Sequence, residues 1–248
     1  MTIVSSGVRI VADGGLGVAD VARALVSMRP ESPPFIIAIT GSVAVGKSTF
    51  AAELAGAVPT LVEIAGTDGF LFPNQILDGR GLTMRKGFPE SFDTDALAAA
   101  LALARVGPVM FPGYSHVTYD VDAALARRID RPEILIVEGL GLGPHRSAID
   151  ALIYLDADEA DLEAWFVARF MGLWAAAEHD PTSFYTRFRS LDRPAAEGLA
   201  RSVWSAINLP NLRENIAPQR EIADLVIRKG PDHEIVEILE RHGQVARL

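Results

Sequence analysis

Short apolar runs alternate along the chain with segments of helical periodicity, which predicts an α/β fold with a mainly parallel central sheet flanked by helices. The runs predicted to be strands cover residues 35–40, 61–65, 133–137, 151–155 and 224–228. The run at 133–137 is apolar enough to indicate burial on both faces. One helix is predicted to begin near Lys47, and another follows an N-cap region at 93–95 and ends near Arg105.

The remaining pattern suggests how the chain is organised around this sheet. Residues 157–220 are almost wholly helical in pattern and could form a layer over one end of the sheet. The first thirty residues carry one helical stretch, at about 17–28. We therefore predict an N-terminal extension with a short helix at 1–34 and a single domain at 35–248, which contains a helical lid or substrate region at about 157–220.

The amino-acid composition of the chain excludes several classes of function. The 248 residues include 23 Lys and Arg against 32 Asp and Glu, a net charge of −9. Such a balance repels nucleic acid and anionic membrane surfaces, so an anionic ligand needs a local pocket. The chain has no cysteine, which excludes disulfides, thiol nucleophiles, iron–sulfur clusters and cysteine zinc sites. No signal peptide or membrane-spanning run is recognisable, so we expect a cytoplasmic protein.

A phosphate-binding loop is the strongest chemical signal. Residues 41–48 read G-S-V-A-V-G-K-S, the G-x-x-x-x-G-K-[ST] pattern, which arises by chance in fewer than about 1% of chains this long. The glycines let backbone N–H groups point at phosphate oxygens, and the following helix offers its N-terminal N–H groups. Lys47 would reach the β- and γ-phosphates, and the Ser48 hydroxyl would ligate Mg²⁺.

Two acidic residues lie at predicted strand ends. Asp68 follows the second strand, and Glu138 ends the run at 134–138. Ligands of open parallel sheets bind beyond the carboxyl ends of the strands, so both side chains should project toward the phosphate loop. A kinase needs an acid near Mg²⁺ and an acceptor for the proton of the attacking hydroxyl. Each residue alone could equally be a solvated acid at a strand end.

The sequence pattern alone does not decide the roles of two further polar residues. Arg169 shares a helical stripe with Phe166, Phe170 and Leu173, so its guanidinium must either extend to water or meet an anion. Asn208 lies one turn from Trp204, where its amide needs either a structural partner or a ligand. Among the five histidines no metal-ligand pair is recognisable, which argues against a transition-metal site.

The order of several motifs resembles the bacterial type I pantothenate kinases, from the uridine kinase and phosphoribulokinase branch of P-loop kinases. The resemblance runs from about residue 34 to 237. Its generic part is the phosphate loop. Its specific parts are R-K-G-F-P-E-S-F-D at 85–93, Y-S-H at 114–116 with Y-D at 119–120, and the segments T-D-G-F-L at 67–71, E-G-L at 138–140 and E-N-I at 214–216.

The resemblance implies a P-loop kinase fold and ATP-dependent phosphorylation of the primary hydroxyl of pantothenate, the first step toward coenzyme A. It implies that Asp68 is the general base, with Lys47 and Arg169 as the other catalytic groups. It further implies ATP and Mg²⁺ as cofactors, a small-molecule substrate and a possible homodimer. The implied nucleotide-binding residues are Gly41, Ser42, Val43, Ala44, Val45, Gly46, Lys47, Ser48, Thr49 and His233; the implied metal ligands are Ser48 and Glu138; the implied substrate-binding residues are Tyr114, His116, Tyr119, Phe166, Arg169 and Asn208.

The chain also departs from that family. Phe166 stands where the family typically has a pocket tyrosine, and the loop at 139–149 is shorter than usual. Ala52 replaces an arginine that assists feedback binding of coenzyme A, and Leu173 and Glu178 replace phenylalanines of the pocket for its thiol end. A glutamate is costly beside an apolar group. We therefore expect coenzyme A to inhibit weakly or not at all.

Three hypotheses follow. The first is a pantothenate kinase, favoured by the retained pocket residues. The second is a paralogous kinase acting on a sugar, polyol or nucleoside, favoured by Phe166 and the short loop. The third is a catalytically silent nucleotide-binding regulator, which the intact Lys47, Ser48, Asp68 and Glu138 argue against.

Overall fold

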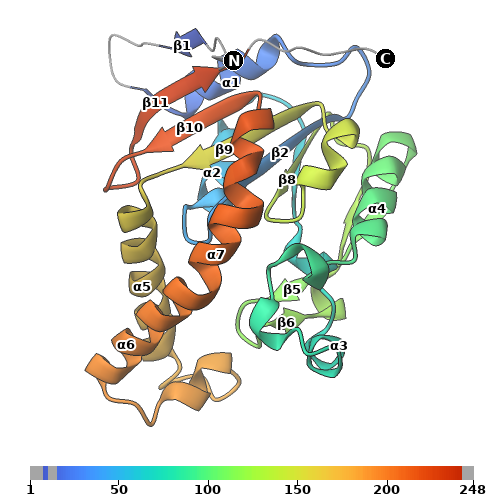
Figure 1. Ribbon diagram of the computed structural model, residues 1–248. Helices are drawn as coiled ribbons and strands as arrows, with labels where there is room; N and C mark the ends of the chain where they lie inside the picture. The colour runs from blue at the N-terminus through green and yellow to red at the C-terminus, as the bar shows by residue number, and fades with distance from the viewer. Residues whose placement is uncertain (1–7, 11–15, 242–248) are drawn as a thin grey trace.

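The computed structural model describes residues 8–10 and 16–241, and within them a seven-stranded sheet forms the centre of the molecule (Figure 1). Its strand order is β1-β11-β10-β9-β2-β8-β3. The strands are β1 (Val8–Ile10), β2 (Phe35–Gly41), β3 (Val62–Gly66), β8 (Ile134–Glu138), β9 (Ala151–Asp156), β10 (Leu225–Lys229) and β11 (Ile235–Glu240). The five from β10 to β3 are parallel, whereas β11 runs antiparallel to β10 and β1 antiparallel to β11.

The predicted mainly parallel sheet is confirmed, because each predicted strand is present within a residue or two of its expected bounds. Strands β1 and β11 at the sheet edge were not predicted. Four short strands outside the main sheet were also missed: β4 (Val109–Phe111), β5 (Tyr114–Ser115), β6 (Asp120–Val121) and β7 (Arg127–Ile129). At two or three residues each, they are too short to give a periodic pattern.

Helices cover both faces of the sheet. α1 (Val18–Val26) packs on α2 (Lys47–Ala57), which in turn packs on β3 and β8. Figure 1 shows α2 behind the sheet and α7 (Leu209–Asn211) in front of it. α4 (Thr94–Val106) begins where the sequence predicted, since the Asp93 carboxylate accepts a hydrogen bond from the Ala96 N–H at 3.0 Å. In the part of the chain that the structure describes, no helix is both long and apolar enough to cross a membrane.

The region 157–220 is helical at its two ends but not throughout. α5 (Glu159–Ala176) and α6 (Arg193–Val203) are joined by a loop that contains only a 3₁₀ turn at Phe184–Phe188. After α6 the helix continues through two π-helical turns, Trp204–Asn208 and Leu212–Ile216, on either side of α7. In Figure 1, α5 and α6 extend below one end of the sheet, and α3 (Asn74–Gly79) with β5 and β6 extends below it on the other side.

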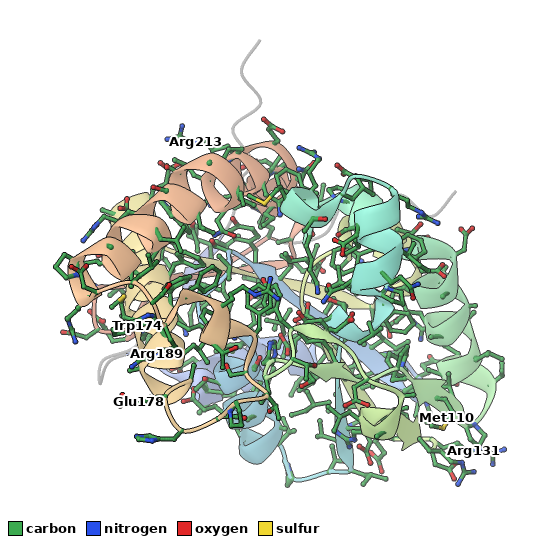
Figure 2. The ribbon with its side chains drawn as sticks, turned by 90° about the horizontal axis from the view of Figure 1, so that it is seen from below. Met110, Arg131, Trp174, Glu178, Arg189 and Arg213 are labelled. Atoms are coloured by element: carbon green, nitrogen blue, oxygen red, sulfur yellow. The ribbon has the colours of Figure 1, made fainter. Side chains whose placement is uncertain are left out.

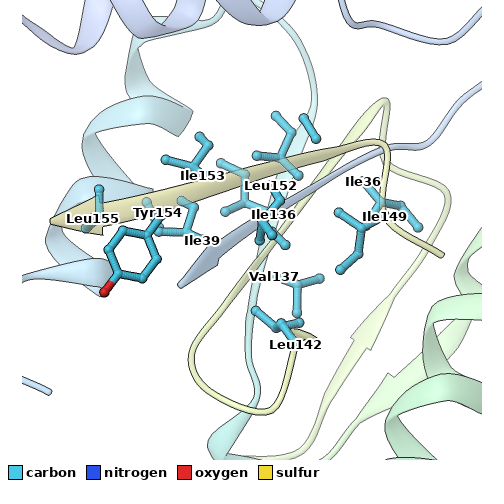
Figure 3. Packing of buried hydrophobic residues seen from close by; sticks show 14 of the residues in the cluster. Ile36, Ile39, Ile136, Val137, Leu142, Ile149, Leu152, Ile153, Tyr154 and Leu155 are labelled. Carbon is cyan, nitrogen blue, oxygen red and sulfur yellow. The ribbon is translucent and has the colours of Figure 1, made fainter. Parts of the chain in front are cut away.

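Aliphatic side chains from the central strands fill the core (Figure 3). Ile39 of β2, Ile136 of β8 and Ile153 of β9 are fully buried. Burying one such side chain contributes about 1.5–3 kcal/mol, so this layer fixes the position of the central strands. Their carboxyl ends carry the phosphate loop and the acidic residues described next.

Candidate active site

The phosphate loop connects the end of β2 to the start of α2. Gly41 and Gly46 have φ angles of +144° and +88°, and Ala44 also has a positive φ, of +64°. A Cβ atom at Gly41 would lie 2.5 Å from the Leu155 carbonyl oxygen, so the loop requires glycine there. The Lys47 ammonium folds back over the loop and donates hydrogen bonds to the carbonyl oxygens of Gly41, at 3.2 Å, and Ser42, at 2.9 Å.

The two acids predicted at strand ends lie beside this loop. Asp68 follows β3 and begins a 3₁₀ turn, and Glu138 is the last residue of β8. The Ser48 hydroxyl donates to Glu138 Oε1 at 2.8 Å. Burial lowers the pKa of Lys47, against the opposing effects of Glu138 and Asp68. Both carboxylates therefore face the Lys47 ammonium, as the strand-end argument predicted.

A cavity of about 180 Å³ adjoins these acids. Asp68 and Glu138 line it on the sheet side, and Tyr114 and His116 line it from the β5–β6 hairpin. The rings of Tyr114 and His116 are 5.1 Å apart between centroids. The structure thus brings two of the predicted substrate-binding residues together with the predicted base.

Tyr119 belongs to the same aromatic group. Its ring is 6.0 Å from that of Tyr114 and 4.8 Å from that of Phe184 in the loop between α5 and α6. Burial raises the pKa of Tyr119 to about 12, and burial likewise raises the pKa of Tyr114. Both phenols therefore stay protonated at neutral pH and can donate hydrogen bonds.

Two residues of this group were not predicted as site residues. Lys86 donates to Asn74 Oδ1 at 2.6 Å and to the Tyr119 carbonyl oxygen at 2.5 Å, and its ammonium lies 4.6 Å from the centre of the Tyr119 ring. The R-K-G-F-P-E-S motif contains Lys86 and could have pointed to it. Tyr185, from the loop between α5 and α6, packs its ring against Phe170 at 5.2 Å, and burial raises the pKa of its phenol. No pattern in its surroundings distinguishes Tyr185 in the sequence.

Arg169 is a predicted site residue on α5. The buried face of α5 carries Phe170, whereas Arg169 is exposed. Its charge acts on the pKa of Lys47, Tyr119 and Tyr185. The guanidinium therefore lies near enough to the phosphate loop and the tyrosine group for its charge to act on them.

Phe166 packs in the interior of the same region. Its ring contacts those of Trp204, at 5.8 Å, and Phe170, at 6.5 Å. It forms an apolar wall between α5 and the first π-helical turn.

The two asparagines near Trp204 have different environments. Asn211 is buried, and its Nδ2 donates to the Gly87 carbonyl oxygen at 2.9 Å, while its Oδ1 accepts from Asn215. Asn208 Nδ2 is also buried, but within the described residues it has no hydrogen-bond partner. A buried amide without a partner costs about 1–3 kcal/mol, which a ligand could recover. Asn211 is thus structural, and Asn208 is available for binding.

His233 lies on the other side of the phosphate loop. Its ring stacks on Trp165, with centroids 3.8 Å apart, and Trp165 Nε1 donates to the Pro231 carbonyl oxygen at 3.0 Å. Burial and the nearby Lys229 ammonium lower the pKa of His233, which favours the neutral imidazole. A stacked neutral ring next to a phosphate loop suits an aromatic base.

The predicted metal ligands form a small oxygen set. Ser48 and Glu138 supply one hydroxyl and one carboxylate within hydrogen-bond distance of each other. Mg²⁺ prefers oxygen donors and keeps several of its waters, so a pair of this kind fits it. In the described ranges no group of three or more His, Cys, Asp or Glu residues could hold a metal ion.

Comparison with known proteins gave consistent matches among kinases. No protein-family model matches the chain. The pantothenate kinase of Sorangium cellulosum is 45% identical over 218 residues, which are 82% of this chain and 71% of that protein. The pantothenate kinase of Myxococcus xanthus is 43% identical over 236 residues, 87% of this chain and 74% of that protein.

Solved structures agree on the fold. A kinase from Silicibacter sp. TM1040, provisionally assigned to a fructose transport system, has a TM-score of 0.64 and 25% identity, and the match covers 80% of this chain and 93% of that one. D-glycerate 3-kinase from Cryptococcus neoformans also has a TM-score of 0.64, over 92% of this chain and all of its own, at 12% identity. At that identity the likeness concerns the fold alone.

Proposed function

The chain belongs to the pantothenate kinase family, and we propose that it transfers the γ-phosphoryl group of ATP to the primary hydroxyl of pantothenate. The observation that carries this proposal is the 45% identity to a pantothenate kinase over 82% of the chain. The site geometry supports it, because Lys47, Asp68 and Glu138 lie together where a kinase needs them.

Phosphoryl transfer passes through a loose transition state, with negative charge on the equatorial oxygens of the transferred group. Catalysis then depends on positioning and on charges that are already in place. The N–H groups of residues 41–48 and the Lys47 ammonium would hold the triphosphate. Arg169, whose charge reaches Lys47, would stabilise the transferred group from the side of α5.

Asp68 would act as the general base. The acceptor oxygen attacks the γ-phosphorus, the bond from that phosphorus to the β–γ bridging oxygen breaks, and ADP leaves. The hydroxyl proton passes to the Asp68 carboxylate late in this step. Its position on the wall of the 180 Å³ cavity supports this role, because the same cavity is lined by Tyr114 and His116.

Ser48 and Glu138 would hold Mg²⁺. When bound, the ion neutralises part of the phosphate charge. Ser48 lies in the first turn of α2 and Glu138 ends β8, so both oxygens come from rigid elements.

The acceptor would bind among Tyr114, His116, Tyr119, Arg169 and Asn208. The protonated phenols of Tyr114 and Tyr119 and the free Asn208 amide are hydrogen-bond donors. Donors of this kind suit the carbonyl and carboxylate oxygens of pantothenate. Phe166 would supply an apolar wall for its methyl groups.

A screen of ATP consumption over pantothenate, ribonucleosides and common sugars tests the proposal. We expect turnover with pantothenate at least about 10²-fold above that with the other acceptors, because buried donors discriminate strongly against ligands that leave them unpaired. Turnover with a sugar, polyol or nucleoside alone would select the paralogous kinase, a candidate that the missing hydroxyl at Phe166 favours. No turnover with any acceptor would indicate a silent nucleotide-binding protein.

A further inference from the structure

The chain uses lysine very sparingly. Of its 23 Lys and Arg residues, only Lys47, Lys86 and Lys229 are lysines. Burial lowers the pKa of all three. Arginine thus carries nearly all of the positive charge, and lysine occurs at three positions with restricted space. A compact ammonium fits such positions, whereas a planar guanidinium needs more room.

Lys47 and Lys86 belong to the site described above, whereas the proposed mechanism does not use Lys229. It is the last residue of β10, and it is only 7% exposed. The register between β10 and β11 shifts between Arg228 and Lys229. Such an irregularity redirects side chains, and here the Lys229 side chain reaches the phosphate loop.

The contact is made with the loop backbone. Lys229 Nζ donates to the Val45 carbonyl oxygen at 3.1 Å. A Cβ atom at Gly46 would lie 3.0 Å from the same nitrogen, which leaves room for a glycine and an ammonium but little else. His233 lies on the other side, and burial together with the Lys229 charge lowers its pKa.

This contact meets a requirement of phosphate loops. When the N–H groups of a short loop point inward at an anion, its carbonyl oxygens point outward and need donors of their own. Lys47 supplies donors to Gly41 and Ser42. Lys229 supplies one to Val45, at the opposite end of the loop.

We propose that Lys229 is a positioning residue of the nucleotide site, whose ammonium holds the Val45 carbonyl oxygen outward so that the loop N–H groups stay directed at phosphate. The inference rests on the proposed function only in that the loop binds a nucleotide. It assigns a role to a buried cation that lies 182 positions from Lys47 in the chain, at the end of β10 rather than in the helix that follows the loop.

The test compares Lys229→Met with the wild type in direct binding of ADP and of adenosine by calorimetry. We expect the Kd for ADP to rise about tenfold or more, as for loss of a charged hydrogen bond. The Kd for adenosine, which carries no phosphate, should change less than about twofold. Arg128→Met is the matched control, because it removes one positive charge from an exposed ion pair with Asp130. It should leave both affinities unchanged.

A chemical rescue separates the effect of the Lys229 charge on ADP affinity from the effect of its side-chain size. Since the chain has no cysteine, Lys229→Cys introduces a single thiol. Alkylation with 2-bromoethylamine restores a lysine-like ammonium there, and alkylation with 2-bromoethanol gives a neutral side chain of similar length. ADP affinity should return with the ammonium and not with the hydroxyl.

Several results would overturn the proposal. These are unchanged ADP affinity in Lys229→Met, equal losses for ADP and adenosine together with a lower Tm, and equal rescue by the two alkylating reagents. Failure of the proposed function would look different, since the wild type would then bind ADP but transfer no phosphate to pantothenate.

Discussion

At the scale of single residues, the chemistry depends most on Asp68. It lies two residues after the end of β3 and lines the same cavity as Tyr114 and His116. Asp68→Asn keeps the shape of the side chain but removes its capacity to accept a proton. We expect kcat to fall about 10²-fold or more while the KM for ATP stays within about threefold. Steady-state kinetics with both substrates varied measures this.

The control for that substitution is Asp130→Asn, which changes an exposed carboxylate that forms an ion pair with Arg128. It should have kinetics like those of the wild type. Near-normal turnover in Asp68→Asn would remove the assignment of Asp68 as the base.

His233 allows a prediction about pH. Burial and Lys229 lower its pKa below 6.5, against the opposing charges of Asp232 and Glu234. The ring should therefore stay neutral to a lower pH than an ordinary histidine does, and become protonated only in more acidic solution. In Lys229→Met the repelling ammonium is gone, so the pKa of His233 should rise toward its ordinary value.

Titration of the His233 ring protons by NMR in the two proteins measures this change. His179 is exposed and serves as an internal reference in the same spectra. An equal pKa for His233 in both proteins would show that Lys229 does not face the ring.

The sequence alone could identify the functional residues that belong to contiguous motifs or follow a known positional rule. Lys47 and Ser48 belong to such a motif, and Asp68 and Glu138 follow from the rule for parallel strand ends. Tyr185 could not be found in this way, because its environment is created by Arg169 and Phe170 on another element. Lys229 likewise needs the β10–β11 register to bring it to Val45.

At the scale of elements, the two π-helical turns after α6 place neighbouring asparagines in different roles. Asn208→Ala removes an amide nitrogen that has no hydrogen-bond partner in the described part of the chain, so we expect the KM for the acceptor to rise about tenfold with little change in Tm. Asn211→Ala removes the bond to Gly87, so we expect a loss of about 1–3 kcal/mol in the free energy of unfolding.

Each variant is the control for the other, measured by acceptor kinetics and by thermal or urea unfolding. If Asn208→Ala lowered stability while acceptor binding stayed intact, Asn208 would be a structural residue and would leave the proposed pocket.

Long and buried elements could be predicted from the sequence, whereas short or partly exposed ones could not. The parallel strands are mostly apolar and were predicted within a residue or two. β11 lies next to the short edge strand β1 and has partly exposed side chains, so its pattern is weaker. The loop at 177–192 interrupts the predicted helical region because its aromatic residues 184, 185 and 188 pack on other elements rather than along one helix face.

At the scale of the whole molecule, the candidate acceptor site is assembled from two distant segments. The Phe184 N–H donates to the Val117 carbonyl oxygen at 2.7 Å, and the Phe184 ring lies 4.8 Å from that of Tyr119. The loop between α5 and α6 thus joins the β5–β6 hairpin. No spacing rule in the sequence links these segments, which is why only the resemblance to a family placed Tyr119 and Arg169 in one site.

The same loop gives a prediction about feedback control. Figure 2 shows Trp174, Glu178 and Arg189 close together at one side of the molecule. The Arg189 guanidinium lies 4.4 Å from the centre of a Trp174 ring and donates to the Trp174 carbonyl oxygen and, at 3.1 Å, to Glu178 Oε2. Where the family resemblance implies phenylalanines for the thiol end of coenzyme A, this chain has an ion pair.

We therefore expect coenzyme A to inhibit weakly, because an apolar thiol end would have to displace or lie beside a charged pair. Initial rates at increasing coenzyme A, with ATP near its KM, measure this, and ADP serves as a positive control for competition. The double substitution Leu173→Phe with Glu178→Phe should strengthen inhibition about tenfold, since it replaces the carboxylate with apolar area. Competitive inhibition of the unaltered enzyme at micromolar coenzyme A would contradict the prediction, and would mean that the Arg189–Glu178 pair opens at little cost.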